Sequence, residues 1–293
     1  MKVHSRGGVG VFTDYRENII VDPDHPILAW KADKDRLRPS WFHGDLHKEF
    51  PRGLAKIGSE HSEDALTWNL FRTLQLSHRI EIVTGIFAPD LDISKLYFWG
   101  HDPDERSEKI DADIQDTLNQ MEPSGRDGLK QQTEPDVILR AKGHVIMVEC
   151  KLGKPGEGVK AWQRSRRGMR HEYVTFMENV GLKKLFADSF DFSSDGNRFY
   201  QLFRNYLLGA ALALRWNADF SLLAIVNALN SNLKGRSHQA EFDAFRAILA
   251  EPSNTLLLAW QQIWDALPSE SSLVAVRKFM ARHPLLAVPK VEI

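Results

Sequence analysis

Two carboxylates and one ammonium stand close together in the stretch from residue 134 to residue 151. Asp136 opens an apolar run, and Glu149 and Lys151 close the next one. Carboxylates that face each other on paired strands repel, so such a pair needs a bound cation or one protonated acid. Carboxylate oxygens without thiolate or imidazole partners suit a hard ion, which indicates Mg²⁺, with Mn²⁺ as a substitute. The pattern therefore predicts metal-assisted activation of water.

A β-hairpin is the element that must position these side chains. Two runs rich in Val, Ile and Leu flank Lys142 and Gly143, and glycine supplies the positive φ that a tight hairpin turn needs. Counting outward from this turn places Asp136 opposite Glu149, with Lys151 on the same face. The alternative is that the two acids simply end their strands in solvent. Apolar residues on both faces of the strands argue for burial, where unpaired charges are costly.

These residues resemble the signature of the PD-(D/E)XK nuclease superfamily, with Pro135-Asp136 as one half and Glu149-Cys150-Lys151 as the other. Other Pro-Asp pairs occur in the chain, but only this one opens an apolar strand that turns and returns with an acid-x-Lys sequence. The resemblance implies that Asp136, Glu149 and the backbone carbonyl of Cys150 hold the metal ion. It also implies that Lys151 orients or deprotonates the attacking water, and that cleavage leaves a 5′-phosphate.

A helix ahead of the hairpin offers a further carboxylate. Ser59 or Ser62 can cap a helix that runs to about residue 77, with acids favourably placed in its first turn. At about 100° per residue, Glu63 falls on the stripe of leucines that faces the core. By resemblance to the superfamily, Glu63 is the helix glutamate of the metal site, with Glu60 as the substitute. The alternative is that Glu63 only complements the helix dipole.

A basic run directly after the site strand is a candidate for contacting nucleic acid. It carries Arg164, Arg166 and Arg167 around Trp162, and it follows a glycine-rich loop. Such a run could grip phosphates. A solvated charged helix is an equally good interpretation, because short runs of Lys and Arg are common.

A strongly apolar helix predicted over residues 197–214 carries a second set of candidates. Gln201 and Arg204 lie in it, and Gln201 shares one face with Asn205 at i and i+4. These residues resemble the Gln/Tyr-bearing helix of RecB-like superfamily members, which implies contact with nucleic acid. Ordinary packing, with the polar residues outward, is the alternative.

The order of the predicted elements gives the fold class. They are a helix at 59–77, strands at 79–87 and 95–99, the hairpin at 134–151, a helix at 197–214 and a strand at 220–229. This is the αβββαβ order of the restriction-endonuclease-like core, an α/β fold with a mixed sheet. Polar insertions are expected near residues 100–133 and 155–194.

Three regions are expected along the chain. Residues 1–58 read as a loosely ordered or strand-containing lead-in, and residues 59–230 as the nuclease-like core. Residues 231–293 read as a C-terminal helical cap, with helices at 241–249, 255–267 and 271–283.

Composition narrows the partners and the compartment. The net charge of the 293 residues is −1, so binding to nucleic acid must come from a local basic patch. Cys150 is the single cysteine, which excludes an intrachain disulfide and a Cys-based zinc site. The chain opens without an apolar signal segment, and its longest apolar run is too short for a bilayer. We expect a cytoplasmic protein that has no membrane partner.

These features together predict a Mg²⁺-dependent nuclease that acts on nucleic acid, with DNA favoured over RNA. A homodimer is compatible with this interpretation. One alternative is a catalytically inactive nuclease-fold protein that acts as a nucleic-acid-binding or assembly subunit. Another is a structural protein in which the motif is incidental. The fold alone does not choose between restriction, repair, mobile-element and anti-phage roles.

Overall fold

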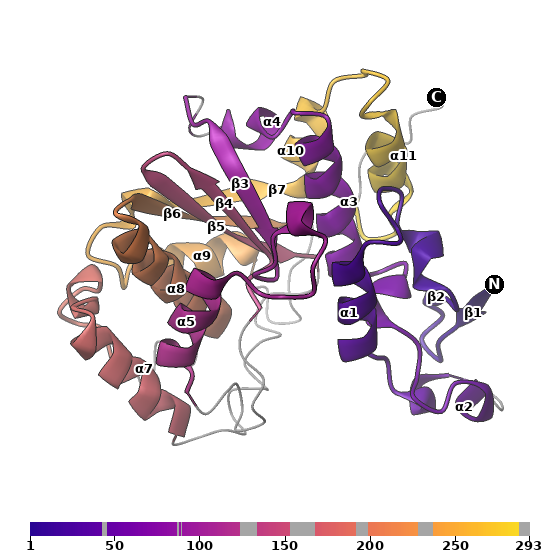
Figure 1. Cartoon of the computed structure of the whole chain (residues 1–293), viewed down its shortest axis with the longest axis horizontal. Helices are drawn as coiled ribbons and strands as arrows, with labels where there is room; N and C mark the ends of the chain where they lie inside the picture. Colours follow the sequence, from indigo (N-terminus) through magenta and orange to yellow (C-terminus); the bar gives the residue numbers. More distant parts are fainter. Residues whose placement is uncertain are drawn as a thin grey trace. The chain divides into compact units, whose positions relative to one another are not determined.

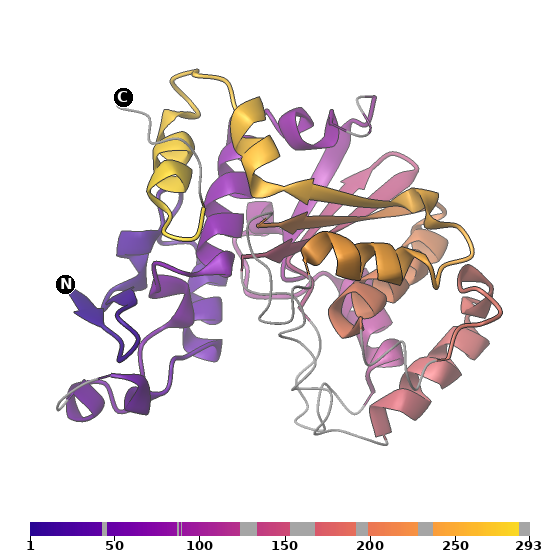
Figure 2. The same ribbon diagram turned by 180° about the vertical axis from the view of Figure 1, so that it is seen from behind.

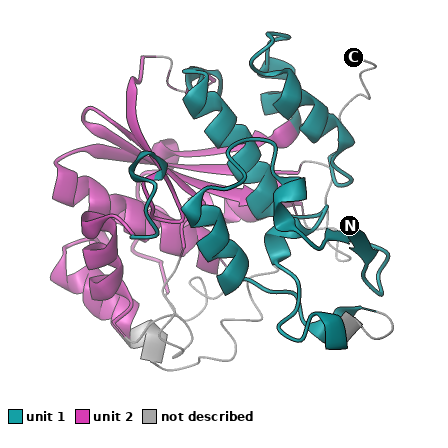
Figure 3. Cartoon of the chain, turned by 45° about the vertical axis from the view of Figure 1, so that its right-hand side comes forward, with its two compact units in different colours: residues 1–83, 103–109, 261–293 teal, residues 84–102, 110–260 magenta. Residues whose placement is uncertain are grey.

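The chain folds into two compact units (Figure 3). The computed structural model describes residues 1–42, 46–86, 88, 90–123, 134–152, 168–191, 199–227 and 237–286. The first unit combines residues 1–83, 103–109 and 261–293, and the second combines residues 84–102 and 110–260. The predicted hairpin therefore lies within the second unit.

The second unit is built on a five-stranded mixed sheet (Figure 1). Its strands, in their order across the sheet, are β3 (Ile93–Phe98), β4 (Val137–Ala141), β5 (His144–Lys151), β6 (Asp219–Val226) and β7 (Thr255–Ala259). The β3–β4 and β4–β5 pairs are antiparallel, whereas the β5–β6 and β6–β7 pairs are parallel. The central strand β5 has four consecutive fully buried apolar residues at 145–148, as expected for a strand that is covered on both faces.

Helices of this unit gather on one face of the sheet, as Figures 1 and 2 show. They are α5 (Ala112–Met121), α7 (Gly168–Asn179), α8 (Tyr200–Trp216) and α9 (His238–Arg246). Helix α8 packs on β5 and β6, and a Cβ at Gly209 would overlap with Met147 of β5. Asn217 then adopts the left-handed conformation (φ 49°) and ends α8, which turns the chain into β6. The absence of a side chain at Gly209 thus sets how closely α8 approaches the strand that carries Glu149.

The first unit is mainly helical. Its strands and helices are β1 (Lys2–His4), β2 (Gly10–Phe12), α1 (Pro26–Lys34), α2 (Leu46–Glu49), α3 (Glu63–Leu76), α4 (Glu81–Thr84), α10 (Trp260–Ala266) and α11 (Val274–Arg282), with α4 and α10 at the boundary with the second unit. Helix α3 begins as expected, because the side chain of Ser62 accepts the backbone N–H of Ala65 at 3.1 Å. Its residues from Asp64 to Leu74 are buried, so α3 is the core helix of this unit.

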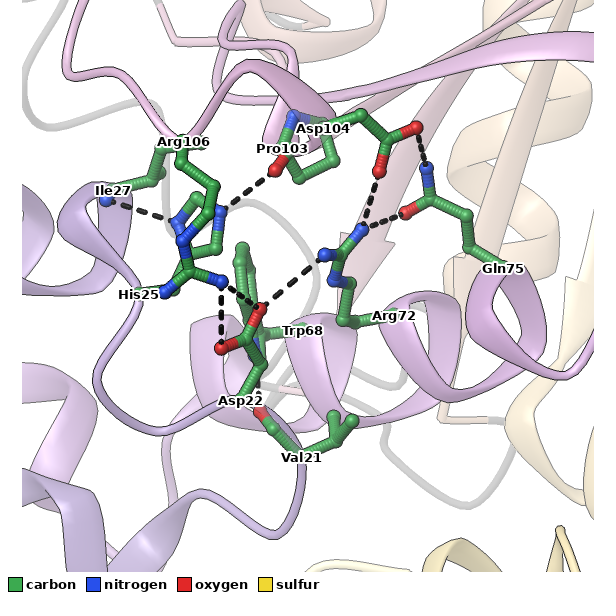
Figure 4. Close-up of polar contacts among 10 residues, drawn as sticks. All are labelled: Val21, Asp22, His25, Ile27, Trp68, Arg72, Gln75, Pro103, Asp104 and Arg106. Atoms are coloured by element: carbon green, nitrogen blue, oxygen red, sulfur yellow. Dashed lines mark hydrogen bonds and ion pairs between the residues drawn. The ribbon is translucent and has the colours of Figure 1, made fainter.

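Arg72, a buried residue of α3, attaches the segment 103–109 to the rest of the first unit (Figure 4). Arg72 donates to Gln75 at 2.7 Å and to Asp104 at 2.9 Å through Nη1, and to Asp22 at 3.3 Å through Nη2. The Arg72 side chain is only 5% exposed, so these partners compensate a charge that has left water.

The observed order confirms the predicted fold class. Along the chain, α3, β3, β4, β5, α8 and β6 follow the αβββαβ order, and β7 adds a parallel edge strand. The helix predicted at 197–214 and the strand predicted at 220–229 correspond to α8 and β6.

Two predicted elements were wrong. The strand expected at 79–87 is instead the short helix α4, because His78 (φ 55°) ends α3 and the chain immediately enters another helical turn. The helix expected at 255–267 begins only at Trp260, and its first part is the strand β7. A short apolar run such as Thr255–Ala259 fits a strand or a buried helix equally well, and pairing with β6 decides between them.

Candidate active site

The hairpin that carries the candidate residues has the predicted turn and register. Gly143 has a φ of 73°, and Ala141 pairs with His144 next to the turn. The ladder continues to the pair of Val137 with Val148. It ends there, so the predicted pairing of Asp136 with Glu149 lies one residue beyond the last pair that the strands form.

Asp136 extends this ladder with its side chain. The residue lies in a bend immediately before β4, where its Oδ2 accepts the backbone N–H of Cys150 at 2.8 Å. A carboxylate thus occupies a position that a strand carbonyl would otherwise take beside β5. This bond holds Asp136 next to the peptide that follows Glu149.

Glu149 is a buried acid with two partners. It is 2% exposed, and its Oε2 accepts a short hydrogen bond from Nδ2 of Asn205 on α8. Its Oε1 lies 3.0 Å from Nζ of Lys151, two residues along the same strand. Alternation along β5 places Met147, Glu149 and Lys151 on the face that α8 covers. The sheet and α8 together therefore fix the orientation of this carboxylate.

The backbone at the end of β5 is anchored as well. The carbonyl of Lys151 accepts the backbone N–H of Asn227 at 3.0 Å and the indole N–H of Trp260 at 3.3 Å. The Lys151 side chain is 24% exposed, so its ammonium reaches the edge of the buried region. One end of the hairpin thus presents two acids and one ammonium.

Further buried polar groups lie close to Glu149. Arg204 of α8 is 3% exposed and lies over the ring of Tyr200, with 5.4 Å between the guanidinium carbon and the ring centroid. Burial by itself would lower the pKa of Arg204, but the nearby Tyr200, Glu149 and Glu122 raise it above its ordinary value. Arg204 therefore stays charged and offsets the negative charge of two buried carboxylates.

Tyr173 of α7 completes this buried group. Its hydroxyl donates a short hydrogen bond to Oε1 of Glu122, and both residues are almost fully buried. Burial, and then the charge of Glu122, raise the pKa of Tyr173 well above its usual range. Tyr173 is thus a neutral donor that fixes Glu122 at the inner end of the group.

A family model described as "restriction endonuclease associating with ARP" matches residues 46–283. The chain belongs to this family. The matched residues of this restriction-endonuclease-like family include α3, the hairpin and α8, which are the described elements that carry candidate residues. No curated protein and no solved structure gave a significant match. None of the helices in the described part of the chain has both the length and the apolar character to cross a bilayer.

The donor set at the hairpin of this restriction-endonuclease-like protein suits a hard divalent ion. It offers the carboxylates of Asp136 and Glu149 and the backbone carbonyl of Cys150, and Glu149 Oε1 has no hydrogen bond within the described structure besides its ion pair. Among the residues described, no three His, Cys, Asp or Glu side chains form a metal-binding group. An ion held by two acids would complete its coordination with water, which Mg²⁺ commonly retains.

The glutamates of the predicted helix belong to the first unit. Glu63 is the first residue of α3, in its first turn, and is partly buried. Glu60 is engaged elsewhere, since it accepts from Lys2 at 2.6 Å and from the backbone N–H of Gly10 at 3.1 Å. The Lys2 ammonium holds the pKa of Glu60 below its usual range. A role for Glu63 in the metal site stays a prediction.

The candidates for nucleic-acid contact separate into two groups. Arg164, Arg166 and Arg167 lie outside the described residues. Gln201 is partly buried on α8, whereas Arg204 is almost completely buried beside Glu149.

Asn205 is the functional candidate that the motif alone does not identify. Its position on one face with Gln201 was visible in the sequence, but its hydrogen bond to Glu149 depends on how α8 packs against β5.

Proposed function

We propose that this restriction-endonuclease-like protein is a metal-dependent nuclease of the PD-(D/E)XK type, which hydrolyses phosphodiester bonds in DNA in preference to RNA. The observation that supports this most directly is the buried carboxylate of Glu149, oriented by Asn205 and Lys151 beside the peptide that Asp136 holds. Burial of an acid costs stability. A carboxylate that is both buried and held in one orientation is therefore expected where it binds a ligand. Membership of the restriction-endonuclease family gives independent support.

In this mechanism the carboxylates of Asp136 and Glu149 and the carbonyl of Cys150 would hold Mg²⁺, for which Mn²⁺ can substitute. Glu63 would act as a further ligand, directly or through water. When bound, the ion lowers the pKa of a coordinated water and offsets the charge that develops on the scissile phosphate. Asn205 keeps Glu149 in one orientation, so the acid needs no reorganisation when the ion binds.

Lys151 is the residue that would act on the attacking water. Its ammonium lies 3.0 Å from Oε1 of Glu149. A charged ammonium donates hydrogen bonds but accepts none, so orientation of the water is the role that this pairing favours. Gln201, Arg204 and the arginines at 164, 166 and 167 remain our candidates for holding the nucleic acid.

Three substitutions test the assignment in an EDTA-controlled assay on linear, circular, single-stranded and branched DNA and on RNA. Lys151→Ala should lower cleavage at least about 100-fold and leave nucleic-acid binding intact. Asp136→Asn and Glu149→Gln should also weaken Mg²⁺ binding, measured by calorimetry, because each removes a charged ligand. Lys184→Ala is a matched control, since Lys184 is an exposed lysine of the same unit.

The outcomes separate the proposal from its alternative. Mg²⁺-dependent cleavage that survives in all three purified variants would refute the assigned residues. Binding of nucleic acid without cleavage of any substrate by the wild-type chain would instead indicate an inactive nuclease-fold subunit.

The family description also names association with ARP, and we propose that this chain works with such a partner. Light scattering of the purified chain, alone and mixed with ARP, would show whether it is a monomer, a homodimer or part of a mixed complex. A mass that does not change on mixing would remove ARP from the proposal and leave the nuclease assignment untouched.

A further inference from the structure

A cavity lies at the other end of the hairpin, at its turn. It has a volume of about 450 Å³ and is formed wholly by the second unit. Its lining residues are Ser94, Lys95, Arg140, Ala141, Lys142, Gly143, Val145, Trp216 and Ala218. Strand β5 separates this cavity from Lys151 by roughly 23 Å, at about 3.3 Å per residue. The cavity is therefore distinct from the candidate active site.

The lining is cationic. It includes Lys95, Arg140 and Lys142 but no carboxylate. The guanidinium carbon of Arg140 lies 4.2 Å from the centroid of the Trp216 ring. Stacking on an aromatic ring occupies the face of a guanidinium and leaves its in-plane N–H groups to donate.

Trp216 is itself fixed in place. Its indole N–H donates to Oδ2 of Asp113 at 2.7 Å, and Arg215 pairs with the other oxygen of the same carboxylate at 2.7 Å. The hydrogen bond from Trp216, and then the charges of Arg215 and Arg140, lower the pKa of Asp113, so this carboxylate also acts on Arg140. The ring therefore provides a rigid support for Arg140, which lowers the entropic cost of using that arginine to bind an anion.

The three cations differ in how far nearby acids offset their charges. Lys95 pairs with Asp102 at 2.9 Å. Arg140 and Lys142 form no ion pair with any carboxylate in the described part of the chain. Asp219, which pairs with His144 across β5 and β6, is a nearby exposed acid and works against an anion. Within the described structure Arg140 and Lys142 are thus free of direct ion pairs, and an anion would bind them against the opposing charges of Asp113 and Asp219.

We propose that this cavity binds a phosphate monoester, the chemical group of a nucleotide and of the 5′-phosphorylated end of a nucleic acid. The planar guanidinium of Arg140 matches a phosphate in geometry, and Lys142 adds a second charge. The cavity falls within the range of about 300–1,000 Å³ typical of small-molecule sites, so it exceeds the space that phosphate alone needs. Val145, Ala141 and Trp216 supply apolar surface for the attached group.

Calorimetry on the full chain in EDTA tests this inference without any cleavage. The probes are adenosine 5′-monophosphate, adenosine, and a short single-stranded oligonucleotide with either a 5′-phosphate or a 5′-hydroxyl. We expect the phosphorylated probes to bind and adenosine to show no saturation in the millimolar range. Arg140→Gln should weaken binding about tenfold or more and Lys142→Gln about threefold, because each removes a charged donor.

Two further variants sharpen the result. Asp219→Asn should tighten binding about twofold, because it removes one of the opposing charges. Lys184→Gln, an exposed lysine of the same unit outside the cavity, should leave binding unchanged. Lys142 is exposed at the turn, so its variant preserves the test even if Arg140→Gln disturbs the fold.

The two phosphorylated probes identify the source of the group. Tighter binding of the 5′-phosphorylated oligonucleotide than of adenosine 5′-monophosphate would assign the cavity to a nucleic-acid end, and equal or weaker binding would assign it to a free nucleotide. Adenosine binding as tightly as its monophosphate would overturn the proposal. So would the absence of any binding, or an affinity that neither Arg140→Gln nor Lys142→Gln changes.

Discussion

Each unit of the molecule buries an arginine, and the two arginines have different surroundings. Arg72 is 4% exposed and has three hydrogen-bond partners, two of them carboxylates (Figure 4). Arg204 is 3% exposed, yet within the described structure it makes no ion pair and no hydrogen bond. Among the described residues, the ring of Tyr200 and more distant carboxylates offset its charge.

This difference separates a group that stabilises the fold from a group that serves a site. A buried guanidinium normally has hydrogen-bond partners, because leaving a charge unpaired in the interior costs several kcal/mol. Arg72 follows this rule through its two terminal nitrogens, which donate to three partners, although its Nε has no partner in the described structure. Arg204 departs from it, because its terminal nitrogens make no hydrogen bond or ion pair in the described structure. It lies near Glu149 and Asn205, and Oδ1 of Asn205 also lacks a partner there. Polar groups that are incompletely satisfied in this way are expected where a ligand completes them.

The largest expected effect is on folding and belongs to Arg72. Arg72→Met should lower the free energy of unfolding by about 3 kcal/mol, because Asp22 and Asp104 lose their buried partner and Asp22 keeps only the longer contact to the exposed Arg106 in the described structure. Urea denaturation measures this, with the solvent-exposed arginine variant Arg16→Met as a control that should change little. Folded Arg72→Met should still cleave at the wild-type rate. A large loss of cleavage at full stability would show that the contrast between the two arginines is false.

The opposite pattern is expected for Arg204. Arg204→Met removes a positive charge near Glu149 and the support that it gives to the position of that carboxylate, so metal binding should weaken and cleavage should fall about 100-fold. The free energy of unfolding should fall by roughly 1–2 kcal/mol, less than in Arg72→Met, because an apolar side chain of similar length fills the space although Glu149 and Glu122 lose a nearby positive charge. Steady-state cleavage, Mg²⁺ calorimetry and urea denaturation of the same preparation decide this. A loss of about 3 kcal/mol in stability with unchanged cleavage would show that Arg204, like Arg72, only stabilises the fold.

The parts of the site that the sequence predicts are those set by neighbouring residues. Lys142 and Gly143 define a turn, and the turn defines the register of the hairpin through simple alternation. The start of α3 at Ser62 is equally local, since a capping side chain reaches only the next few residues. For the same reason the position of Asp136 beside the end of β5 was predictable.

The contacts of the site that the sequence did not predict depend on packing between segments that are distant in the chain. Asn205 lies 56 residues from the Glu149 that it contacts, and only the approach of α8 at Gly209 brings them together. The pairing of Tyr173 with Glu122 joins α7 to the residue that follows α5 in the same way. Strand β7 was misassigned because a five-residue apolar run has no intrinsic preference strong enough to override its neighbours.

Stability should also depend on pH through His283, a buried polar residue of the first unit that serves folding. Burial, and then the charge of His61, lower the pKa of His283 to about 4. The unfolded chain has a histidine pKa of about 6.5, so between these values it binds a proton that the folded chain does not. Stability is therefore complete above about pH 6.5 and falls as the pH drops below it, by about 2 kcal/mol at about pH 5.

Urea denaturation at neutral and acidic pH measures this dependence. His283→Asn should flatten it, because the Asn oxygen can still accept the backbone N–H of Leu285 without titrating. His4→Asn, at an exposed position, is the control and should keep the wild-type dependence. An unchanged pH dependence in His283→Asn would assign the titration to another group.

The smallest expected effect concerns Glu63. It shows whether Glu63 stabilises the fold, as Arg72 does, or serves the site, as Arg204 does. If Glu63 only complements the dipole of α3, Glu63→Gln should lower the free energy of unfolding by about 0.5 kcal/mol and leave cleavage unchanged. Our proposal that Glu63 takes part in metal binding predicts an additional, roughly tenfold weakening of Mg²⁺ affinity and of cleavage, because the substitution keeps the shape but removes the charge. Glu60→Gln is the informative partner variant: it breaks the contacts to Lys2 and Gly10 and should affect stability alone. Loss of cleavage in Glu60→Gln but not in Glu63→Gln would exchange their roles, and loss in neither would leave metal binding to the hairpin of the second unit.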